Sequence, residues 1–341
     1  MRAAPFFEHG PAGVIRYHDS FPDPAAVKGN VAVRVECCGV NHLDIWTRQG
    51  IQGRTIRLPH ICGCDIVGRV EGAKGRTRRV LVYPGISCGR CIACRSGAEN
   101  LCSRFAIIGG MSDYDGGYAE LVSVPARNII DIPSSLGTAA AATLAVSYLT
   151  AWNMLRTNGA GKNSTLLVYG GSSGIGMATI QLSKALGVPM VITTASTEEK
   201  RDFSKDLGAD YVIDTTGDIA ARVSEITGGR GVDIVIDHVG AATWTASISS
   251  LKQGGRMAVC GMTSGNDAVV PVRAFYTKQL IMTGALLGTK AQLAELVRFV
   301  ARKKIHPVID SVFALKDARL AQERMESGRH MGKILIDCRS M

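Results

Sequence analysis

The sequence has no apolar segment long enough to cross a membrane. Its longest apolar run, residues 139–152, spans about 14 residues and contains Thr143, Ser147 and Thr150, whereas a transmembrane helix needs about 20. This run predicts a buried helix. The first ten residues also lack the apolar core of a signal peptide, and no repeat or low-complexity tract is present. We therefore expect no association with membranes.

Positive charge is in excess but is not concentrated. The formal net charge is +10, aromatic residues make up only 6% of the chain, and basic residues form only short clusters at 76–79 and 302–304. A nucleic-acid-binding surface would need a dense basic block with interleaved aromatic side chains, so we expect no nucleic-acid partner. The charge is consistent with a well-mixed basic surface, or with attraction of a phosphorylated cofactor or a CoA thioester.

Cysteine is abundant, and four of the ten cysteines are clustered. Ten cysteines without a secretion signal are typical of a reducing compartment, which predicts a cytoplasmic location. Four of them follow C-x2-C-x2-C-x7-C spacing, which predicts one tetrahedral Zn²⁺ site in a lobe at about residues 84–104. Four sulfur ligands leave no open coordination position, so this zinc would be structural. The predicted ligands are Cys88, Cys91, Cys94 and Cys102.

The sequence pattern changes near residue 165. Before this point short strand patterns are frequent, such as 31–35, 79–83 and 116–124. After it, strand-like runs alternate with helical patterns, which predicts a parallel doubly wound sheet. A helix at 292–302 and a strand at 333–337 follow, and we expect this tail to return to the N-terminal domain. The predicted strands of the parallel sheet are 165–169, 190–194, 211–214, 232–237, 256–260 and 280–286.

A glycine-rich turn follows the first predicted strand of the second half. It fits the G-x-G-x-x-G pattern except that Ser173 replaces the central glycine. Small residues here let a pyrophosphate approach the backbone N–H groups at a helix N-terminus. The strand before the turn and the helix after it are the context that dinucleotide binding requires. The predicted cofactor-binding residues of the turn are Gly171, Ser172, Ser173, Gly174, Ile175 and Gly176.

The end of the second predicted strand indicates which cofactor binds. NAD sites usually carry an acidic residue here that binds the ribose 2′-OH, but we place Ala195 at this position. Without a carboxylate, and with Ser196 and Lys200 nearby, a 2′-phosphate would meet no charge repulsion. We therefore predict NADP(H) as the cofactor, with Ser196 and Lys200 near the 2′-phosphate.

The cysteine lobe, the order of the two domains and the late glycine-rich turn together resemble the medium-chain dehydrogenase/reductase superfamily. This superfamily includes the zinc alcohol dehydrogenases and the quinone oxidoreductases. The segments 39–44, 63–68 and 332–334 also match its motifs. The resemblance covers essentially the whole chain.

The resemblance implies a two-domain α/β fold. A GroES-like, β-rich catalytic domain is expected at residues 1–147 and 288–341, and a doubly wound parallel Rossmann domain that binds NADP is expected at 148–287. It also implies a homodimer or a homotetramer.

The matching positions do not support the catalytic zinc of the zinc alcohol dehydrogenases. The resemblance places the ligands of that zinc at Asn41, Cys64 and Val146. None of these positions carries the residue type that the family uses there as a zinc ligand. A catalytic zinc needs three protein ligands and an open position, and Cys64 with Asp65 supplies at most two. We therefore expect no catalytic zinc, although other cysteines nearby leave a rearranged site open.

Without a catalytic metal, alcohol oxidation lacks the Lewis acid that it needs. Hydride addition to an electron-poor C=C bond or a quinone is better supported, because hydrogen-bond donors can stabilise the enolate-like oxygen. We predict an NADPH-dependent reductase of the quinone oxidoreductase type, acting on small-molecule enones, quinones or 2-enoyl-CoA thioesters such as acryloyl-CoA. The predicted catalytic residues are Asn41, Asp65 and Tyr148, with Tyr276 as another candidate proton donor, and the predicted cofactor contacts include His42 and Thr150.

Two other functions remain open. The first is a zinc-dependent alcohol dehydrogenase with an atypical catalytic site around Cys64 and Asp65, which would hold two zinc ions per subunit. The second is a non-catalytic NADPH-binding protein that acts as a sensor or an RNA-associated factor. Metal content per subunit and a screen for NADPH oxidation separate them from the predicted reductase.

Overall fold

The computed structural model describes residues 1–72 and 75–339, and the chain divides into two compact units. Unit 1 comprises Met1–Leu149 and Thr289–Met341, and unit 2 comprises Thr150–Gly288. These bounds lie within two residues of those expected from the sequence. No helix among the described residues has both the length and the apolar character needed to span a bilayer.

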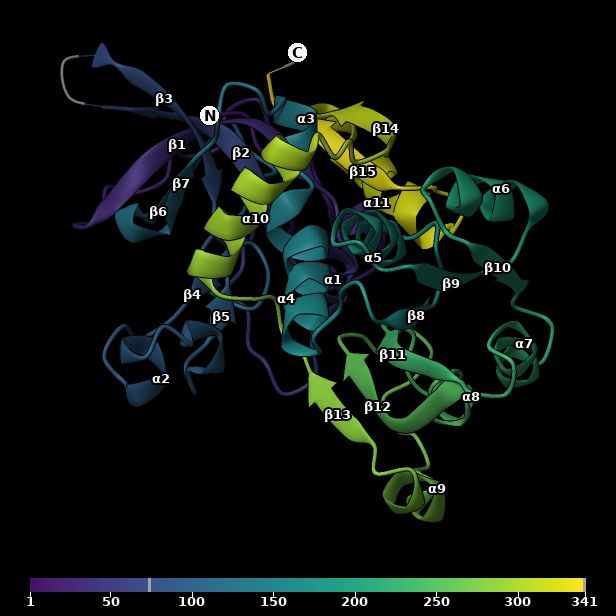
Figure 1. Cartoon of the computed structure of the whole chain (residues 1–341). Helices are drawn as coiled ribbons and strands as arrows, with labels where there is room; N and C mark the ends of the chain where they lie inside the picture. The colour runs from purple at the N-terminus through teal and green to yellow at the C-terminus, as the bar shows by residue number, and fades with distance from the viewer. Residues whose placement is uncertain (73–74, 340–341) are drawn as a thin grey trace. The chain divides into compact units, whose positions relative to one another are not determined.

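One sheet, mostly antiparallel, forms the core of unit 1 (Figure 1). Its strands are β1 (Asn30–Gly39), β2 (Asp65–Glu71), β3 (Thr77–Val82), β6 (Leu121–Pro125), β7 (Ile129–Asp131), β14 (Ile309–Ala314) and β15 (Lys333–Asp337). The strand order is β14-β15-β1-β2-β3-β7, and β6 also pairs with β1. Because β15 is the last strand of the chain, its antiparallel pairing with β1 brings the C-terminal tail back to the N-terminal domain.

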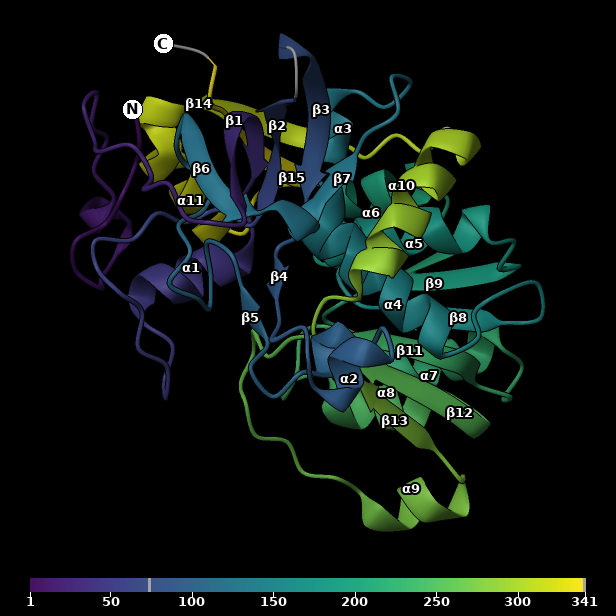
Figure 2. The same ribbon diagram turned by 90° about the vertical axis from the view of Figure 1, so that its left-hand side faces the viewer.

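The cysteine lobe and several helices complete unit 1. Figure 2 shows α2 in the lobe, away from the seven-stranded sheet and connected to it through a small two-stranded ribbon. The elements of the lobe are β4 (Gly85–Ile86), α2 (Ile92–Arg95), the 3₁₀ turn η3 (Glu99–Leu101) and β5 (Ala106–Ile107). The helices outside the lobe are α1 (His42–Gln49), α3 (Thr138–Ala141), α10 (Lys290–Lys303) and α11 (Ala318–Glu326), and the other 3₁₀ turns are η1 (Ala12–Val14), η4 (Ala126–Asn128) and η6 (Leu315–Asp317).

The apolar run at 139–152 does not form the single helix that the sequence predicts. Instead, α3 is followed by a π-helical turn (Leu144–Tyr148) and then by α4 (Leu149–Thr157). Within the turn, the backbone N–H of Val146 donates a hydrogen bond to the carboxylate of Asp65 at 2.8 Å. Turns of the π type are frequently found at functional sites.

Unit 2 is a six-stranded parallel sheet with the order β10-β9-β8-β11-β12-β13, which confirms the predicted doubly wound α/β fold. Its strands are β8 (Thr165–Val168), β9 (Met190–Ala195), β10 (Tyr211–Asp214), β11 (Val232–Asp237), β12 (Leu251–Val259) and β13 (Ile281–Gly284). Its helices after α4 are α5 (Gly174–Ala185), α6 (Glu198–Asp206), α7 (Ile219–Ile226), α8 (Trp244–Ser250) and α9 (Val272–Thr277).

The strand order of unit 2 positions a ligand site. All four residues of β8 are buried, as expected for a central strand of a parallel sheet that is covered on both faces. The order of the strands reverses between β8 and β11. Ligands of such sheets bind beyond the carboxyl ends of the strands at this reversal, which is where the glycine-rich turn follows β8.

Candidate functional site

The four clustered cysteines bring their sulfur atoms together in the lobe. All four Sγ atoms lie within 4.8 Å of one another. The sulfur atom of Cys94 is 3.8 Å from that of Cys88 and 3.5 Å from that of Cys91. A tetrahedron with Zn–S bonds of about 2.3 Å has edges of about 3.8 Å, so the four ligands fit one zinc ion.

Electrostatics in the lobe also suit a metal. Backbone N–H groups of Arg90 and Cys91 lower the pKa of the Cys88 thiol to about 5, and the pKa of Cys94 is also lowered, whereas side-chain hydrogen bonds with neighbouring cysteines raise the pKa of Cys91 to about 11. The thiolate, which is the form that binds metal, is therefore favoured at two of the four ligands. In residues 1–72 and 75–339, these four cysteines form the one group of three or more side chains that could hold a metal ion. Because four sulfur atoms fill a tetrahedral shell, the lobe is a structural zinc site.

The glycine-rich turn connects β8 to α5 and exposes a helix N-terminus. Ser173 is the N-cap of α5, and its Oγ accepts a hydrogen bond from the N–H of Gly176 at 3.0 Å. A Cβ at Gly176 would lie 2.1 Å from the carbonyl oxygen of Gly170, so the turn requires glycine there. The first N–H groups of a helix have no acceptor within it. Ser173, Gly174 and Ile175 remain partly exposed, so a phosphate could bind to this N-terminus.

The first two predicted residues of the turn lie deeper. Gly171 and Ser172 are both buried. A Cβ at Gly171 would lie 2.5 Å from Ser204 Oγ and 2.8 Å from Thr193 Oγ1. Gly171 therefore allows the turn to pack closely against β9 and α6.

β9 ends at Ala195, the position where an NAD-binding site would carry an acidic residue. Ser196 is exposed and Lys200 lies in the first turn of α6. The neighbour of Ala195 on β10 is Asp214, and the carboxylate of Asp214 forms an ion pair with Arg201 at 2.6 Å. A carboxylate therefore lies beside the end of β9, but it is already paired with an arginine of the chain.

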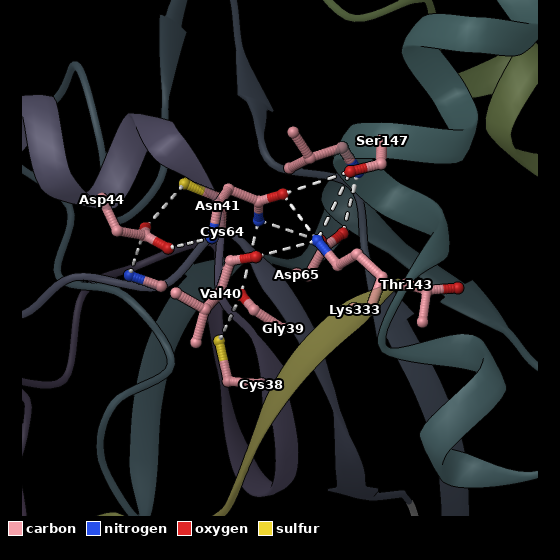
Figure 3. Close-up of polar contacts among 12 residues, drawn as sticks. Cys38, Gly39, Val40, Asn41, Asp44, Cys64, Asp65, Thr143, Ser147 and Lys333 are labelled. Atoms are coloured by element: carbon pink, nitrogen blue, oxygen red, sulfur yellow. Dashed lines mark hydrogen bonds and ion pairs between the residues drawn. The ribbon is translucent and has the colours of Figure 1, made fainter. Parts of the chain in front are cut away.

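Asn41 and Asp65, two of the predicted catalytic residues, contact each other in unit 1 (Figure 3). Asn41 is the N-cap of α1, and Asp65 is the first residue of β2. Asn41 Nδ2 donates to Asp65 Oδ2 at 2.9 Å, and Asp65 Oδ1 accepts the N–H of Val146 at 2.8 Å. Both side chains are buried, and Asp65 has no exposed surface.

Lys333 supplies the positive charge of this cluster, and the sequence did not predict it. Its side chain is 2% exposed. Figure 3 shows its ammonium group pointing at the oxygen atoms of Asn41, Asp65 and Ser147. Lys333 Nζ lies 2.7 Å from Asn41 Oδ1, 2.9 Å from the carbonyl oxygen of Val40, 3.1 Å from Asp65 Oδ2 and 3.4 Å from Ser147 Oγ. We call Lys333, Asn41, Asp65 and Ser147 the Lys333 cluster.

The amide group of Asn41 is fully used inside the protein. Its Oδ1 accepts from Lys333 and from Ser147 Oγ, and its Nδ2 donates to Asp65 and, at 3.4 Å, to the carbonyl of Gly39. A side-chain amide has two donor hydrogens and one acceptor oxygen with two lone pairs, and all are accounted for. The geometry therefore supports a positioning role for Asn41 more than a direct hydrogen bond to a substrate oxygen.

Cys64 points away from Lys333 toward a second carboxylate, that of Asp44. Cys64 Sγ lies 3.7 Å from Asp44 Oδ1, and Asp44 Oδ2 accepts hydrogen bonds from the N–H of Asn41 and the hydroxyl of Tyr118. Burial raises the pKa of the Cys64 thiol well above its usual value and that of Asp44 to about 6. With the oxygens of Asp65 also occupied, the residues around Cys64 do not fit a catalytic zinc.

The other predicted residues lie in different surroundings. Tyr148 is fully buried at the end of the π turn, and burial raises the pKa of its phenol, which makes proton donation harder. His42 is exposed on α1, where its ring lies 6.2 Å from that of Trp46. Thr150 is buried in α4 of unit 2, and Tyr276 is exposed on α9.

A Rossmann-type dinucleotide-binding unit and a β-rich unit with a structural zinc lobe define a nicotinamide-dependent oxidoreductase. Comparison with known proteins agrees: residues 27–134 match the alcohol dehydrogenase GroES-like domain, and residues 174–302 match the zinc-binding dehydrogenase family. An alcohol dehydrogenase of Geobacillus stearothermophilus is 32% identical over 321 residues, which cover 92% of this chain and 93% of that protein. The chain belongs to the zinc-type alcohol dehydrogenase family of the medium-chain dehydrogenases/reductases.

Solved structures and further relatives refine this placement. The crystal structure of an NAD-dependent alcohol dehydrogenase is 34% identical and has a TM-score of 0.92, covering 99% of this chain and 100% of the other. A quinone oxidoreductase of Rattus norvegicus is 28% identical over 98% of this chain and 97% of its own length. An acryloyl-coenzyme A reductase of Metallosphaera sedula is 26% identical over 92% and 94%.

These comparisons confirm the superfamily and the GroES-like domain, and they correct one expectation. The sequence analysis places the chain with the quinone oxidoreductases. The Geobacillus stearothermophilus alcohol dehydrogenase at 32% identity and the solved NAD-dependent alcohol dehydrogenase at 34% are, however, more similar to this chain than the rat quinone oxidoreductase at 28%.

Proposed function

We propose that this protein is an NADPH-dependent reductase that adds hydride to an electron-poor C=C bond or a quinone without a catalytic zinc. The observation that carries the proposal is the position of the Lys333 ammonium group. It contacts Asn41 itself, Asp65 beside Cys64, and Ser147 beside Val146. Asn41, Cys64 and Val146 are the positions where the family resemblance implies the three ligands of a catalytic zinc.

A fixed ammonium group and a metal ion support different chemistry. Zinc with an open coordination position binds a substrate oxygen directly and lowers the pKa of an alcohol. The ammonium of Lys333 is surrounded by four oxygen atoms of the protein, so it has no open position for a substrate oxygen. Reduction of a conjugated bond depends less on such direct binding, because the developing negative charge spreads over the conjugated system to an oxygen.

The cofactor would bind at the N-terminus of α5, and the nicotinamide supplies the hydride when it is bound. We propose NADPH as the preferred form. Ala195 ends β9 without a carboxylate, and the neighbouring Asp214 is paired with Arg201. The relatives that are named NAD-dependent alcohol dehydrogenases support the opposite preference, so the cofactor needs a direct test.

Alcohol dehydrogenation is the second candidate function. It is favoured by the names of the relatives, since the 32% identical protein and the 34% identical structure are both alcohol dehydrogenases. In that case the Lys333 cluster would have to open, or alcohol oxidation would have to proceed with protein groups alone. The metal content of the active protein distinguishes these cases.

A parallel screen tests the proposal. The purified zinc-loaded protein is mixed with NADPH or NADH and with quinones, enones, enoyl-CoA thioesters and aldehydes, and oxidation of the cofactor is followed by absorbance. Alcohols are tested with the oxidised cofactors, and zinc per subunit is measured by mass spectrometry. We expect turnover of enones, enoyl thioesters or quinones with NADPH and one zinc ion per subunit.

Three other results would change the conclusion. Alcohol or aldehyde turnover with two zinc ions per subunit would replace the proposal by the second candidate. Alcohol turnover with one zinc ion would keep the metal-free site but change the substrate class. Binding of NADPH without turnover of any acceptor would indicate the non-catalytic function.

Substitution of Ala195 tests the cofactor assignment. Asp at this position places a carboxylate where the 2′-phosphate is expected, so Ala195→Asp should lower kcat/KM for NADPH and shift the preference toward NADH by at least about tenfold, the equivalent of one charge–charge repulsion of ~1.4 kcal/mol. Ala195→Asn is the matched control because it has nearly the same shape without the charge. An equal shift in both variants, or none in either, would show that Ala195 does not face the 2′ position.

A further inference from the structure

We propose that the hydroxyl group of Ser147 delivers the proton of the reduction and that Lys333 resupplies it. This inference rests on the proposed function, because adding hydride to a C=C bond or a quinone also requires a proton. Tyr148 is poorly placed to supply it, because it has no exposed surface. Ser147 is the next residue in the chain and lies in contact with a buried ammonium group.

The hydrogen bonds of Ser147 are the long ones of the Lys333 cluster. Ser147 Oγ lies 3.4 Å from Lys333 Nζ and 3.4 Å from Asn41 Oδ1. Hydroxyl hydrogen bonds usually have lengths of about 2.7–2.8 Å, and the bond from Lys333 to Asn41 is 2.7 Å. The hydroxyl hydrogen of Ser147 is therefore in no short hydrogen bond of the cluster and can turn to another acceptor at small cost.

Burial gives the members of the cluster different access to a substrate. Asp65 has no exposed surface and Lys333 has only 2%, whereas Ser147 retains 5%. Asn41 retains a similar exposed fraction, but every donor and acceptor of its amide group is already in a hydrogen bond within the protein. Ser147 is thus the member that can contact the buried ammonium on one side and an external group on the other.

The π turn holds Ser147 in this place. The N–H of Val146 is bonded to Asp65 Oδ1 at 2.8 Å, and Asp65 Oδ2 is bonded to Lys333 at 3.1 Å. The carboxylate therefore fixes both the backbone just before Ser147 and the cation that Ser147 contacts. This arrangement gives the π turn a function, because a regular helix would direct the N–H of Val146 to a backbone carbonyl.

The proposed step balances in atoms and charge. The hydride forms a C–H bond at the β-carbon of the substrate, and the π electrons move to the carbonyl oxygen. The O–H bond of Ser147 breaks as its proton moves to the α-carbon, or to oxygen in a quinone. One N–H bond of Lys333 breaks as a proton moves to Ser147 Oγ, which leaves a neutral amine. After the product has left, a proton from solvent returns to this amine through Ser147 Oγ, because Ser147 keeps a small exposed surface whereas Lys333 is buried. The site gains one positive charge on the oxidised cofactor and loses one at Lys333.

Substitution of Ser147 tests the proton step. With the best acceptor from the screen, Ser147→Ala should lower kcat about 10²- to 10⁴-fold, the usual contribution of general acid catalysis, with little change in KM. The solvent deuterium isotope effect on kcat should rise, and the isotope effect from NADPH deuterated at C4 should shrink, because proton transfer becomes slower than hydride transfer. Ser147→Thr keeps a hydroxyl and should restore most of kcat.

Thr143→Val is the matched control. Thr143 is another buried hydroxyl in the same segment, but it donates to the carbonyl of Ala140 at 2.7 Å. This variant should keep the wild-type isotope effects. Thermal unfolding of all variants is measured in parallel, so that a loss of folded protein is separated from a loss of the proton step.

Lys333→Arg tests the resupply of the proton. A guanidinium group keeps the positive charge but does not lose its proton in proteins. If Lys333 only provides charge, a folded Lys333→Arg variant should have kcat near that of the wild type. The proposal predicts a loss of kcat and a raised solvent isotope effect, as for Ser147→Ala.

Two sets of results would overturn the inference. One is a folded Ser147→Ala variant with kcat within about twofold of the wild type and unchanged isotope effects. The other is a Ser147→Thr variant that is as impaired as Ser147→Ala. A wild-type protein that turns over no acceptor would refute the proposed function and this inference together. A wild-type protein that oxidises only alcohols would refute the substrate class. The Ser147 and Lys333 variants would then test whether Ser147 accepts the proton that leaves the alcohol.

Discussion

The cysteine lobe and the Lys333 cluster, both in unit 1, each gather four polar side chains around one point, but they carry different charges. In the lobe, four sulfur atoms lie within 4.8 Å of one another and repel one another when they are ionised. In the Lys333 cluster, a carboxylate, an amide and a hydroxyl surround an ammonium group that the chain supplies itself. The lobe is therefore completed by a metal ion, whereas the Lys333 cluster is complete without one.

The two clusters also differ in burial, and this difference decides how each forms. Cys88, Cys91 and Cys94 are partly exposed, so solvent reaches their site and can supply the metal ion. Lys333 and Asp65 are almost entirely buried, so they must pair as the chain folds, and an unpaired partner would be costly. One chain thus uses a metal where solvent has access and a side-chain cation where it does not.

Of the substitutions that test the difference between the two clusters, removal of one zinc ligand should have the largest effect on stability. Cys94→Ser leaves three sulfur ligands and should lower the zinc content from one ion per subunit to near zero. Because metal binding is coupled to folding, and structural zinc contributes about 10–16 kcal/mol in zinc-finger peptides, thermal stability should fall strongly. Metal analysis and calorimetry on the same sample measure both effects.

Cys260→Ser is the control for this variant. Cys260 lies in unit 2 and is not one of the four clustered cysteines. This variant should keep its zinc. If Cys94→Ser retains both zinc and the melting temperature of the wild type, the lobe is not a structural metal site.

Removal of the cation from the Lys333 cluster should have the next largest effect. Lys333→Met leaves the buried carboxylate of Asp65 without its counterion, which should lower the free energy of unfolding by about 3–5 kcal/mol. The double variant Lys333→Met/Asp65→Asn removes both charges and should be less destabilised than the single one. Chemical denaturation of the wild type and the three variants gives the coupling energy between the two residues.

Zinc content provides the comparison between the two regions in this experiment. All Lys333 and Asp65 variants should keep one zinc ion per subunit, because the lobe does not depend on that charge pair. Additive effects of the two substitutions would contradict the pairing. An extra zinc ion in the double variant would show that the cluster can hold a metal once the ammonium is removed.

The difference between the cysteine lobe and the Lys333 cluster also explains which features can be predicted from the sequence. The four cysteines and the glycine-rich turn are local patterns, so their spacing alone predicts the geometry that the structure shows. The contacts of Lys333 reach Ser147, which is 186 residues away, and Asn41, which is 292 residues away. They depend on the pairing of β15 with β1, and no local pattern contains that information.

The segment at 139–152 shows the same limit. Its apolar composition predicts a buried helix, and burial is observed for most of it. The π turn within it contains Val146, whose N–H bonds to Asp65, a residue on another element. The elements β14 and α11 are missed for a different reason. β14 has no fully buried residue and α11 is short, so neither gives a strong periodic signal.

The smallest predicted effect concerns Asp44, the carboxylate on the other side of Asn41. Burial raises its pKa to about 6, whereas an unfolded chain has a value of about 3.9. Between about pH 4 and pH 6 the folded protein therefore holds a proton that the unfolded chain has lost. In this range the contribution of Asp44 to the free energy of unfolding falls as pH rises, since stability decreases wherever the native state binds more protons.

Asp44→Asn removes this titration, so its stability should decline less across the range than that of the wild type. Urea unfolding at several pH values measures the slope, and Asp131→Asn is the control because it removes an exposed carboxylate. Equal slopes in Asp44→Asn and the wild type would show that Asp44 is not protonated in the folded protein, and that the hydrogen bonds from Asn41 and Tyr118 compensate its burial. The Asn41 region would then contain the ionised carboxylate of Asp44 in addition to the ion pair between Asp65 and Lys333.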